Sequence, residues 1–234
     1  EIKGDILALQ KGDITALRSE LAAFLAGISD GSFFQRMSVP AKYRRIRDIA
    51  ISGNGEATMV AEFPEVVRII GEERMAAGLD DSVKTVLITN SSLIQRSHVQ
   101  AGLQCMSQMN GEIWFKIDTA IANERQFINS CTISETRILT NLQRSASLCS
   151  TWIQTCVFAL DGRPAANYDA YLDLIRKIVD GGQQVSGVML YGPARPSMQA
   201  LAVDTGIPCS QLDDRVIGRL HEIRRIGPAL LRVP

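Results

Sequence analysis

The sequence has no closely spaced cysteines, few histidines and no long apolar run, and each absence removes a class of protein. Its five cysteines are scattered, and no Cys-x-x-Cys pair occurs, which excludes a zinc ribbon, a thioredoxin-like site and a disulfide framework. With only two histidines, His98 and His221, neither a histidine-rich metal centre nor a Ser-His-Asp triad is expected. No segment approaches the roughly 20 apolar residues that span a membrane. We therefore expect a cytoplasmic protein.

The chain also has no excess of positive or negative charge, because its 25 Lys and Arg side chains balance its 25 Asp and Glu side chains. This balance gives no strong signal for nucleic-acid binding. The length of 234 residues and the 46% hydrophobic content fit one large α/β domain, or two small ones, with a substantial core. The chain begins with Glu1 rather than Met, and its first ten residues contain no turn or cap. We therefore expect further residues upstream in the intact protein.

Short β-rich apolar runs alternate with helical stretches, which is typical of βαβ construction. The predicted strands cover residues 47–52, 84–90, 112–118, 151–158 and 185–191. The predicted helices cover residues 15–25, 63–79, 93–109, 134–148, 167–179 and 213–225. Strands that are apolar throughout and separated by helices are typical of a parallel sheet with right-handed crossovers. The pattern leaves open whether the sheet closes into a complete barrel.

Polar residues follow the first two predicted strands, at the end where parallel α/β proteins place their chemistry. In Ser52-Gly-Asn-Gly-Glu-Ala-Thr58, the glycines allow close approach of a ligand to the backbone, and Glu56 supplies a carboxylate. This combination suits a ligand ammonium group better than a phosphate. A tight turn with a helix-capping Glu56 is the structural alternative. Asn90 and its neighbours follow the second strand, where they either line a site or cap the next helix.

The later strands also end in polar side chains. Lys116 and Asp118 are two positions apart and share one face of their strand, so they form an ion pair or contact a ligand. Gln154 and Cys156 share a face of the next strand, where a Gln among apolar residues needs a hydrogen-bond partner. Arg195 follows the last strand between two prolines. It either lies on the surface or binds a carboxylate or phosphate group.

Taken in order, these segments resemble the radical S-adenosylmethionine superfamily. The stretch Asp48–Thr58 resembles the second strand of that family with its glycine-rich motif, and residues 86–93 and 114–118 resemble the third and fourth strands. Gly192-Pro-Ala-Arg-Pro196 is similar to an Arg-Pro element after the sixth strand. The resemblance covers about residues 12–200. It implies an α/β fold, a partial (β/α)6 TIM-like barrel with parallel strands that lacks the first strand, in one domain over 1–200. Residues 201–234 are expected to form a C-terminal helical extension.

The resemblance also implies roles for individual residues. The methionine amino group of S-adenosylmethionine would be held by Gly53, Asn54, Gly55 and Glu56. Asn90 would lie near the cofactor, and its ribose or carboxylate would lie near Lys116 and Asp118. The substrate side would be formed by Gln154 and Arg195. Ala57 stands where the family usually has proline, which is a small change to the turn.

The family motif Cys-x-x-x-Cys-x-x-Cys, which binds three irons of a [4Fe–4S] cluster, does not occur in this chain. No metal ligand is therefore assigned. In the family this motif follows the first strand, which would place it just upstream of Glu1, so truncation is favoured over loss of the motif. The implied cofactor is S-adenosylmethionine. The cluster and an electron donor are expected only for an intact protein that carries the upstream cysteines.

The function implied by the resemblance is that of a radical S-adenosylmethionine enzyme. In such an enzyme the cluster reductively cleaves the cofactor to a 5′-deoxyadenosyl radical; the substrate, small or macromolecular, is not predicted. One alternative is a degenerate, non-catalytic barrel that binds a nucleoside cofactor or a protein partner. Another is an ordinary barrel enzyme for a phosphorylated metabolite, with Lys116 as a Schiff-base or electrostatic residue.

Overall fold

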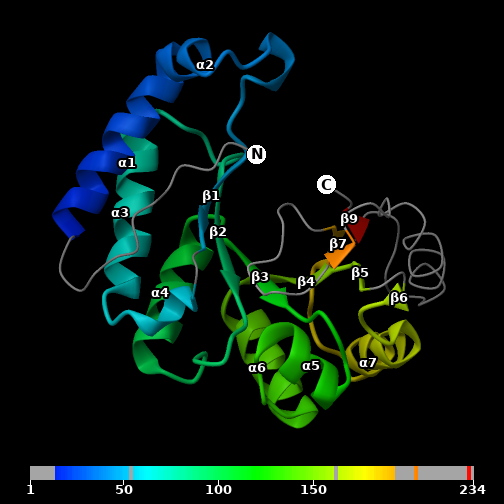
Figure 1. Ribbon diagram of the computed structural model, residues 1–234. Helices are drawn as coiled ribbons and strands as arrows, with labels where there is room; N and C mark the ends of the chain where they lie inside the picture. Colours follow the sequence, from blue (N-terminus) through cyan, green and yellow to red (C-terminus); the bar gives the residue numbers. More distant parts are fainter. Residues whose placement is uncertain (1–13, 53–54, 161–162, 193–202, 205–230, 233–234) are drawn as a thin grey trace. The chain divides into compact units, whose positions relative to one another are not determined.

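The computed structural model describes residues 14–52, 55–160, 163–192, 203–204 and 231–232. The chain forms two compact units (Figure 1). The first unit contains the residues up to Thr89 together with Leu93–Glu112. The second unit contains Asn90–Ser92 together with the residues from Ile113 onward. Each unit is therefore discontinuous in sequence.

The first unit combines two parallel strands with helices. Its elements are α1 (Ile14–Ser29), α2 (Ser32–Arg36), the 3-10 helix η1 (Ala41–Tyr43), β1 (Asp48–Ile51), η2 (Ala57–Met59), α3 (Phe63–Ala76), β2 (Lys84–Thr89) and α4 (Ser97–Gln108). β1 and β2 are paired in parallel, with Asp48 opposite Lys84. This arrangement confirms the first two predicted strands and their direction.

Helices α3 and α4 pack closely because small residues lie between them. α3 begins with Pro64 in its first turn, where proline is tolerated, and ends before Gly78, whose φ of 69° suits glycine. A Cβ on Gly102 of α4 would lie 2.4 Å from the Phe63 ring, so a larger residue has no room there. The buried Arg74 donates hydrogen bonds to the carbonyl oxygens of Val83 and Met109. It thereby ties α3 to the segments that enter β2 and leave α4.

The second unit contains a parallel sheet and a small antiparallel one. Its elements are β3 (Glu112–Lys116, whose first residue belongs to the first unit), α5 (Ala122–Asn129), α6 (Glu135–Leu148), β4 (Ser150–Cys156), β5 (Ala159–Leu160), β6 (Arg163–Pro164), α7 (Tyr168–Asp180), β7 (Gly187–Tyr191), β8 (Val203–Asp204) and β9 (Leu231–Arg232). The sheet order is β3-β4-β7-β9, with β4, β7 and β9 paired in parallel. β5 pairs with β6 and β8 in the antiparallel sheet.

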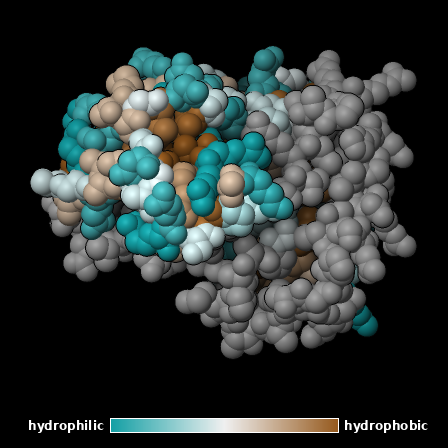
Figure 2. Space-filling view, turned by 90° about the horizontal axis from the view of Figure 1, so that it is seen from above, coloured by the Kyte–Doolittle hydropathy of each residue, from teal (hydrophilic) through white to brown (hydrophobic). Residues whose placement is uncertain are grey.

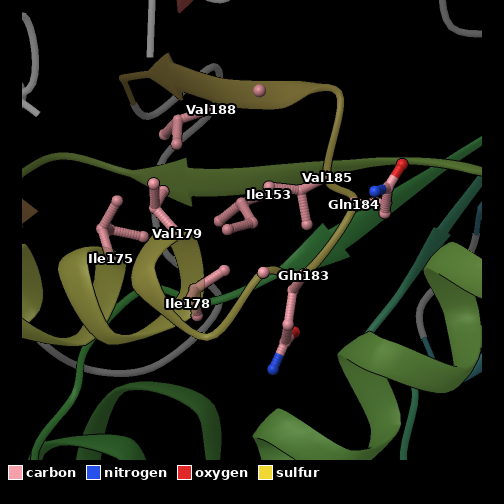
Figure 3. A pocket seen from close by; sticks show the side chains of 10 residues that line it. Ile153, Ile175, Ile178, Val179, Gln183, Gln184, Val185 and Val188 are labelled. Carbon is pink, nitrogen blue, oxygen red and sulfur yellow. The ribbon is translucent and has the colours of Figure 1, made fainter. Parts of the chain in front are cut away.

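Helix α7 covers one face of this sheet. Its N-cap Asn167 accepts a hydrogen bond from the Ala170 backbone N–H, as sequence-based capping rules favour. Thr155 of β4 points to this helix and forms a 2.7 Å hydrogen bond with the Tyr171 hydroxyl. Figure 3 shows Ile153 and Val188 of the sheet facing the apolar side chains of α7 across a cavity of about 350 Å³. This face of the sheet is therefore part of the hydrophobic core.

The predicted α/β class is confirmed, and the described strands form open sheets, as expected of a partial barrel. The five predicted strands correspond to β1, β2, β3, β4 and β7. The helix predicted over 213–225 lies outside the described residues. In the view from above, hydrophobic residues form a small patch surrounded by hydrophilic ones (Figure 2). Within the described ranges, no helix has the length and apolar character to cross a membrane.

Candidate functional site

Glu56 is held at the carboxyl ends of β1 and β2 in the first unit. Its Oε1 accepts hydrogen bonds from the Thr58 backbone N–H (3.2 Å) and the Thr58 hydroxyl (2.7 Å). The Thr89 hydroxyl, at the end of β2, donates a third at 2.6 Å. The helix-capping role weighed from the sequence is confirmed, because Glu56 is the N-cap of η2. The same contacts fix the carboxylate at the edge where a ligand was expected.

The glycine-rich turn before Glu56 is described only in part. Gly53 and Asn54 lie outside the described residues, as does Arg195. Gly55 is exposed, and a Cβ placed on it would meet no atom of the described residues within 4 Å. Among these residues, packing therefore does not require glycine at this position.

Thr58, Thr89 and His98 support Glu56 and were not assigned a role from the sequence. Thr58 and Thr89 are buried and donate to the carboxylate directly. A ring nitrogen of His98, in α4, lies 3.2 Å from the Thr58 carbonyl oxygen and so holds the η2 turn. The only signal in the sequence was the presence of Thr58 and Thr89 inside the two strand-end motifs.

Asn90 belongs to a three-residue segment, Asn90–Ser92, that is part of the second unit. Its Oδ1 accepts a 2.9 Å hydrogen bond from the Ser92 backbone N–H, and Ser91 has a positive φ of 53°. Asn141 of α6, 1% exposed, donates to the Ser91 carbonyl oxygen at 2.9 Å. The sequence allowed either a cap or a site residue here, and the structure shows a turn stabilised by Asn90 itself.

Asp118 is a buried carboxylate that joins three parts of the second unit. Its Oδ1 accepts a 2.8 Å hydrogen bond from the Cys156 backbone N–H at the end of β4. Its Oδ2 accepts a 2.6 Å hydrogen bond from the Asn129 side chain at the end of α5. The side chain is 2% exposed. Both oxygens are therefore bound by protein donors, which is the arrangement that a buried carboxylate requires.

Lys116 and Asp118 form the ion pair that their spacing allowed. The Lys116 Nζ lies 3.7 Å from Asp118 Oδ2, farther than the Asn129 amide, and the Lys116 side chain is 35% exposed. The lysine therefore extends its charge toward the surface at the carboxyl end of β3. Of the two residues, Lys116 is better placed to contact a ligand.

Gln154 lies beside Lys116 on the face of the sheet opposite α7. The Ile117 backbone N–H donates to the Gln154 carbonyl oxygen, which places Lys116 next to Gln154 across the β3–β4 pair. Gln154 is 9% exposed. Its Oε1 is buried and has no hydrogen-bond partner among the described residues. The partner expected from the sequence is therefore absent from this part of the chain.

Two tyrosines that interact with the Asp118 charge, the buried Tyr171 and the half-buried Tyr191, have raised pKa values. Burial is the main cause of the raised pKa of Tyr171; the hydrogen bond between its hydroxyl and Thr155 opposes this rise, and the Asp118 charge adds to it. The pKa of Tyr191 is raised by burial first, then by the Asp118 charge and the Cys156 thiol. Both hydroxyls are consequently neutral at physiological pH.

The described residues do not fit a [4Fe–4S] cluster. They contain no group of three or more His, Cys, Asp or Glu side chains arranged to hold a metal ion. Cys105, Cys131, Cys149 and Cys156 are all free thiols, and Cys149 is buried. A cluster needs several thiolates close together, so this part of the chain does not supply its ligands.

The predicted site residues thus form two described groups, one in each unit. The first unit brings Gly55 and Glu56 together with Thr89. The second brings Lys116, Asp118 and Gln154 together on neighbouring strand ends.

Comparison with solved structures identifies a shared fold. The crystal structure of Streptococcus suis SuiB bound to S-adenosylmethionine matches with a TM-score of 0.56 and 12% identity, covering 86% of this chain and 42% of that chain. A second crystal structure of SuiB matches with a TM-score of 0.55, at the same identity and coverage. Archaeal TYW1 gives a TM-score of 0.46 at 13% identity, over 75% of this chain and 56% of its own.

The comparisons at the sequence level give no match. No protein-family model matches the chain, and neither does a curated protein. The chain spans less than half the length of the SuiB chains that it matches. At 12% identity this likeness shows the fold alone, and it does not define the chemistry of this chain.

Proposed function

We propose that this chain binds S-adenosylmethionine at the carboxyl ends of its strands, as the cofactor-binding part of a radical S-adenosylmethionine enzyme. The observation that carries the proposal is the Glu56 carboxylate, fixed by three hydrogen bonds next to the exposed Gly55. The fold shared with a structure bound to S-adenosylmethionine supports it. The ordered strand-end motifs of the sequence support it as well.

Glu56 would pair with the ammonium group of the methionine moiety. An oriented carboxylate loses little entropy when it forms a charge-assisted hydrogen bond, so the prior fixation by Thr58 and Thr89 favours binding. Gly53, Asn54 and Gly55 would add backbone contacts to the same group. Asn90 would lie near the cofactor, and Lys116 and Asp118 would lie near its ribose or carboxylate, with Lys116 making the direct contact.

The redox part of the proposal concerns a protein that also carries the cluster-binding cysteines. The described residues do not fit the cluster, so for this chain we propose cofactor binding alone. When bound elsewhere in such a protein, the cluster supplies the electron for reductive cleavage of the cofactor. An electron donor and a cytoplasmic location belong to the same proposal, and the substrate stays open.

Isothermal titration calorimetry with S-adenosylmethionine and 5′-methylthioadenosine tests the role of Glu56. The second compound lacks the amino-acid moiety and therefore the ammonium group. We expect Glu56→Gln to weaken S-adenosylmethionine binding by roughly 10- to 100-fold, because a charge-assisted hydrogen bond is lost. Binding of 5′-methylthioadenosine should change little. Glu65→Gln, on the exposed surface of α3, is the matched control.

Two results would contradict this proposal. One is the absence of any heat of binding for S-adenosylmethionine with the unmodified chain. The other is an equal loss of affinity for both compounds in Glu56→Gln, which would indicate a disturbed turn rather than a lost ammonium contact. The circular dichroism spectra of both variants report whether the fold is retained.

A further inference from the structure

Residues 36–47, which lead from the end of α2 to β1 in the first unit (Figure 1), form a cationic segment. Between Gly31 and Arg47 the sequence contains no Asp or Glu. The same stretch contains five basic residues, and all of them are exposed: Arg36, Lys42, Arg44, Arg45 and Arg47. Because the whole chain has equal numbers of acidic and basic side chains, this local excess does not appear in the total charge.

The described residues do not neutralise these charges. Other arginines of the protein, such as Arg18 and Arg176, form ion pairs with carboxylates on neighbouring turns or helices. Among the described carboxylates, none forms an ion pair with a basic side chain of the cationic segment. Arg36 acts on the Asp30 carboxylate, where its charge adds to the hydrogen bonds from Ser32 that mainly lower the pKa of that group. The segment therefore presents positive charge to the solvent.

The cationic segment has a defined backbone that is anchored to the sheet. The Arg44 Nε donates a 2.8 Å hydrogen bond back to the Val39 carbonyl oxygen, across the 3-10 helix η1. The Lys84 backbone N–H, at the start of β2, donates to the Arg47 carbonyl oxygen at 3.2 Å. The segment is thus fixed at the amino ends of β1 and β2. A surface that is ordered before binding loses little conformational entropy when a ligand arrives.

Tyr43 adds an exposed aromatic ring among the cations. The residue is 60% exposed, and the Lys42 Nζ lies 4.8 Å from the centre of its ring. Exposed aromatic rings flanked by basic side chains are typical of surfaces that bind single-stranded nucleic acids, because bases stack on the ring while phosphates contact the cations. Four of the five basic residues are arginines, whose planar guanidinium groups suit phosphate oxygens. An anionic membrane fits less well, because α2 has only five residues and offers no extended amphipathic helix.

We propose that the cationic segment binds single-stranded nucleic acid, with Arg45 and Arg47 contacting backbone phosphates and Tyr43 stacking on a base. This surface is separate from the proposed cofactor site. The cationic segment enters β1 at its amino end, whereas Glu56 follows the carboxyl end of the same strand. The inference therefore goes beyond the proposed function and does not depend on it.

Fluorescence anisotropy with labelled oligouridylate and oligothymidylate of about 15 nucleotides, titrated at several salt concentrations, provides the test. Each phosphate contact on a single strand contributes about 0.7 to the slope of log affinity against log salt concentration. We expect Arg45→Gln/Arg47→Gln to make this slope shallower by about 1.4 and to weaken binding roughly 10- to 30-fold at about 0.1 M salt. Tyr43→Ala should weaken binding roughly 5- to 100-fold and leave the slope unchanged, because it removes stacking and no charge.

Arg137→Gln/Arg163→Gln is the matched control. Both arginines are exposed and belong to the second unit, and the double variant removes the same amount of charge. Its affinity and salt slope should equal those of the unmodified chain. Glu56→Gln should also bind the oligonucleotides normally, so a failure of the cofactor proposal is distinguishable from a failure of this one. Circular dichroism checks that each variant keeps its fold.

Several results would overturn the inference. The first is that neither oligonucleotide binds at about 0.1 M salt. The second is an equal loss of salt slope in the control double variant, which would indicate a general effect of net charge. A third is unchanged affinity in Tyr43→Ala, since the surface would then recognise charge alone, as expected for an acidic protein partner. Finally, sedimentation of the chain with phosphatidylserine vesicles, without binding of either oligonucleotide, would show that the anion is a lipid headgroup.

Discussion

Glu56 in the first unit and Asp118 in the second both follow a strand, yet they are bound in different ways. Three hydrogen bonds converge on one oxygen of Glu56, from a turn and the end of β2. Asp118 uses both oxygens to bind β4 and α5, and it is almost fully buried. The first arrangement orients a carboxylate, whereas the second uses a carboxylate to join structural elements. Polarity at a strand end therefore does not by itself identify a ligand contact.

The largest expected effect comes from Asp118→Asn. An amide offers one acceptor oxygen, so either the Cys156 N–H or the Asn129 amide would face another donor. We expect the free energy of unfolding, measured by urea denaturation, to fall by about 2–4 kcal/mol. Asp173→Asn, in an exposed pair with Arg176, should cost less than about 1 kcal/mol. Equal losses of unfolding free energy in the two variants would contradict the structural role of Asp118 and thus its difference from Glu56.

An intermediate effect is expected at alkaline pH, where the buried Tyr171 and the half-buried Tyr191 begin to ionise in the unfolded chain. Their folded-state pKa values are raised, mainly by burial, above the value of about 10 in the unfolded chain. The stability they contribute is therefore complete below pH 10 and is lost as the pH rises above it, by up to about 1.4 kcal/mol per pH unit for each tyrosine. Urea denaturation at several pH values checks this. Tyr171→Phe should give a shallower decline, and an unchanged decline would contradict the expectation.

The smallest effect is expected for Thr89→Val, which tests whether the hydrogen bond from Thr89 to Glu56 contributes to ligand binding. The variant removes one of the three donors to Oε1 and keeps the shape of the side chain. We expect S-adenosylmethionine affinity to fall by roughly 2- to 10-fold in calorimetry, as for one hydrogen bond. Thr89→Ser keeps the hydroxyl and should bind nearly normally. If Thr89→Val binds as tightly as the unmodified chain, fixation of the carboxylate does not contribute to binding.

The fold was predictable where the local pattern and the tertiary structure agree. β2 has an apolar centre over residues 86–88 and is mostly buried, as predicted, and Asn167 starts α7 as an ordinary N-cap. Helix α5 was missed because Ala122–Asn129 has little apolar periodicity. It is held by polar contacts instead: Arg125 donates to the carbonyl oxygens of Ala120 and Ile133. Such contacts depend on tertiary geometry and leave no periodic signal.

The site was predictable in its positions and less so in its contacts. The two-residue spacing of Lys116 and Asp118 placed both on one face, and the ion pair is present. The other partners of Asp118 come from Asn129 and Cys156, which are 11 and 38 residues away in the sequence. The requirement of Gln154 for a partner was recognised, but its neighbour across the strand pair, Lys116, follows only from the register. The spacing of residues along one strand shows which side chains share a face. Which residues are paired across two strands is known only from the structure.

The turn at Asn90–Ser92 has a consequence for dissecting this protein. The chain passes from the first unit into the second for three residues, where Asn141 binds the Ser91 carbonyl oxygen, and then returns to the first unit. The two units are thus interleaved along the polypeptide. Neither can be released intact by one proteolytic cleavage or encoded as one uninterrupted gene fragment. Cleavage of the backbone near Ser91 would break the chain connection between β2 and α4 in the first unit. It would also disturb the hydrogen bond between Asn141 of α6 and Ser91 in the second unit, so one cut affects both units.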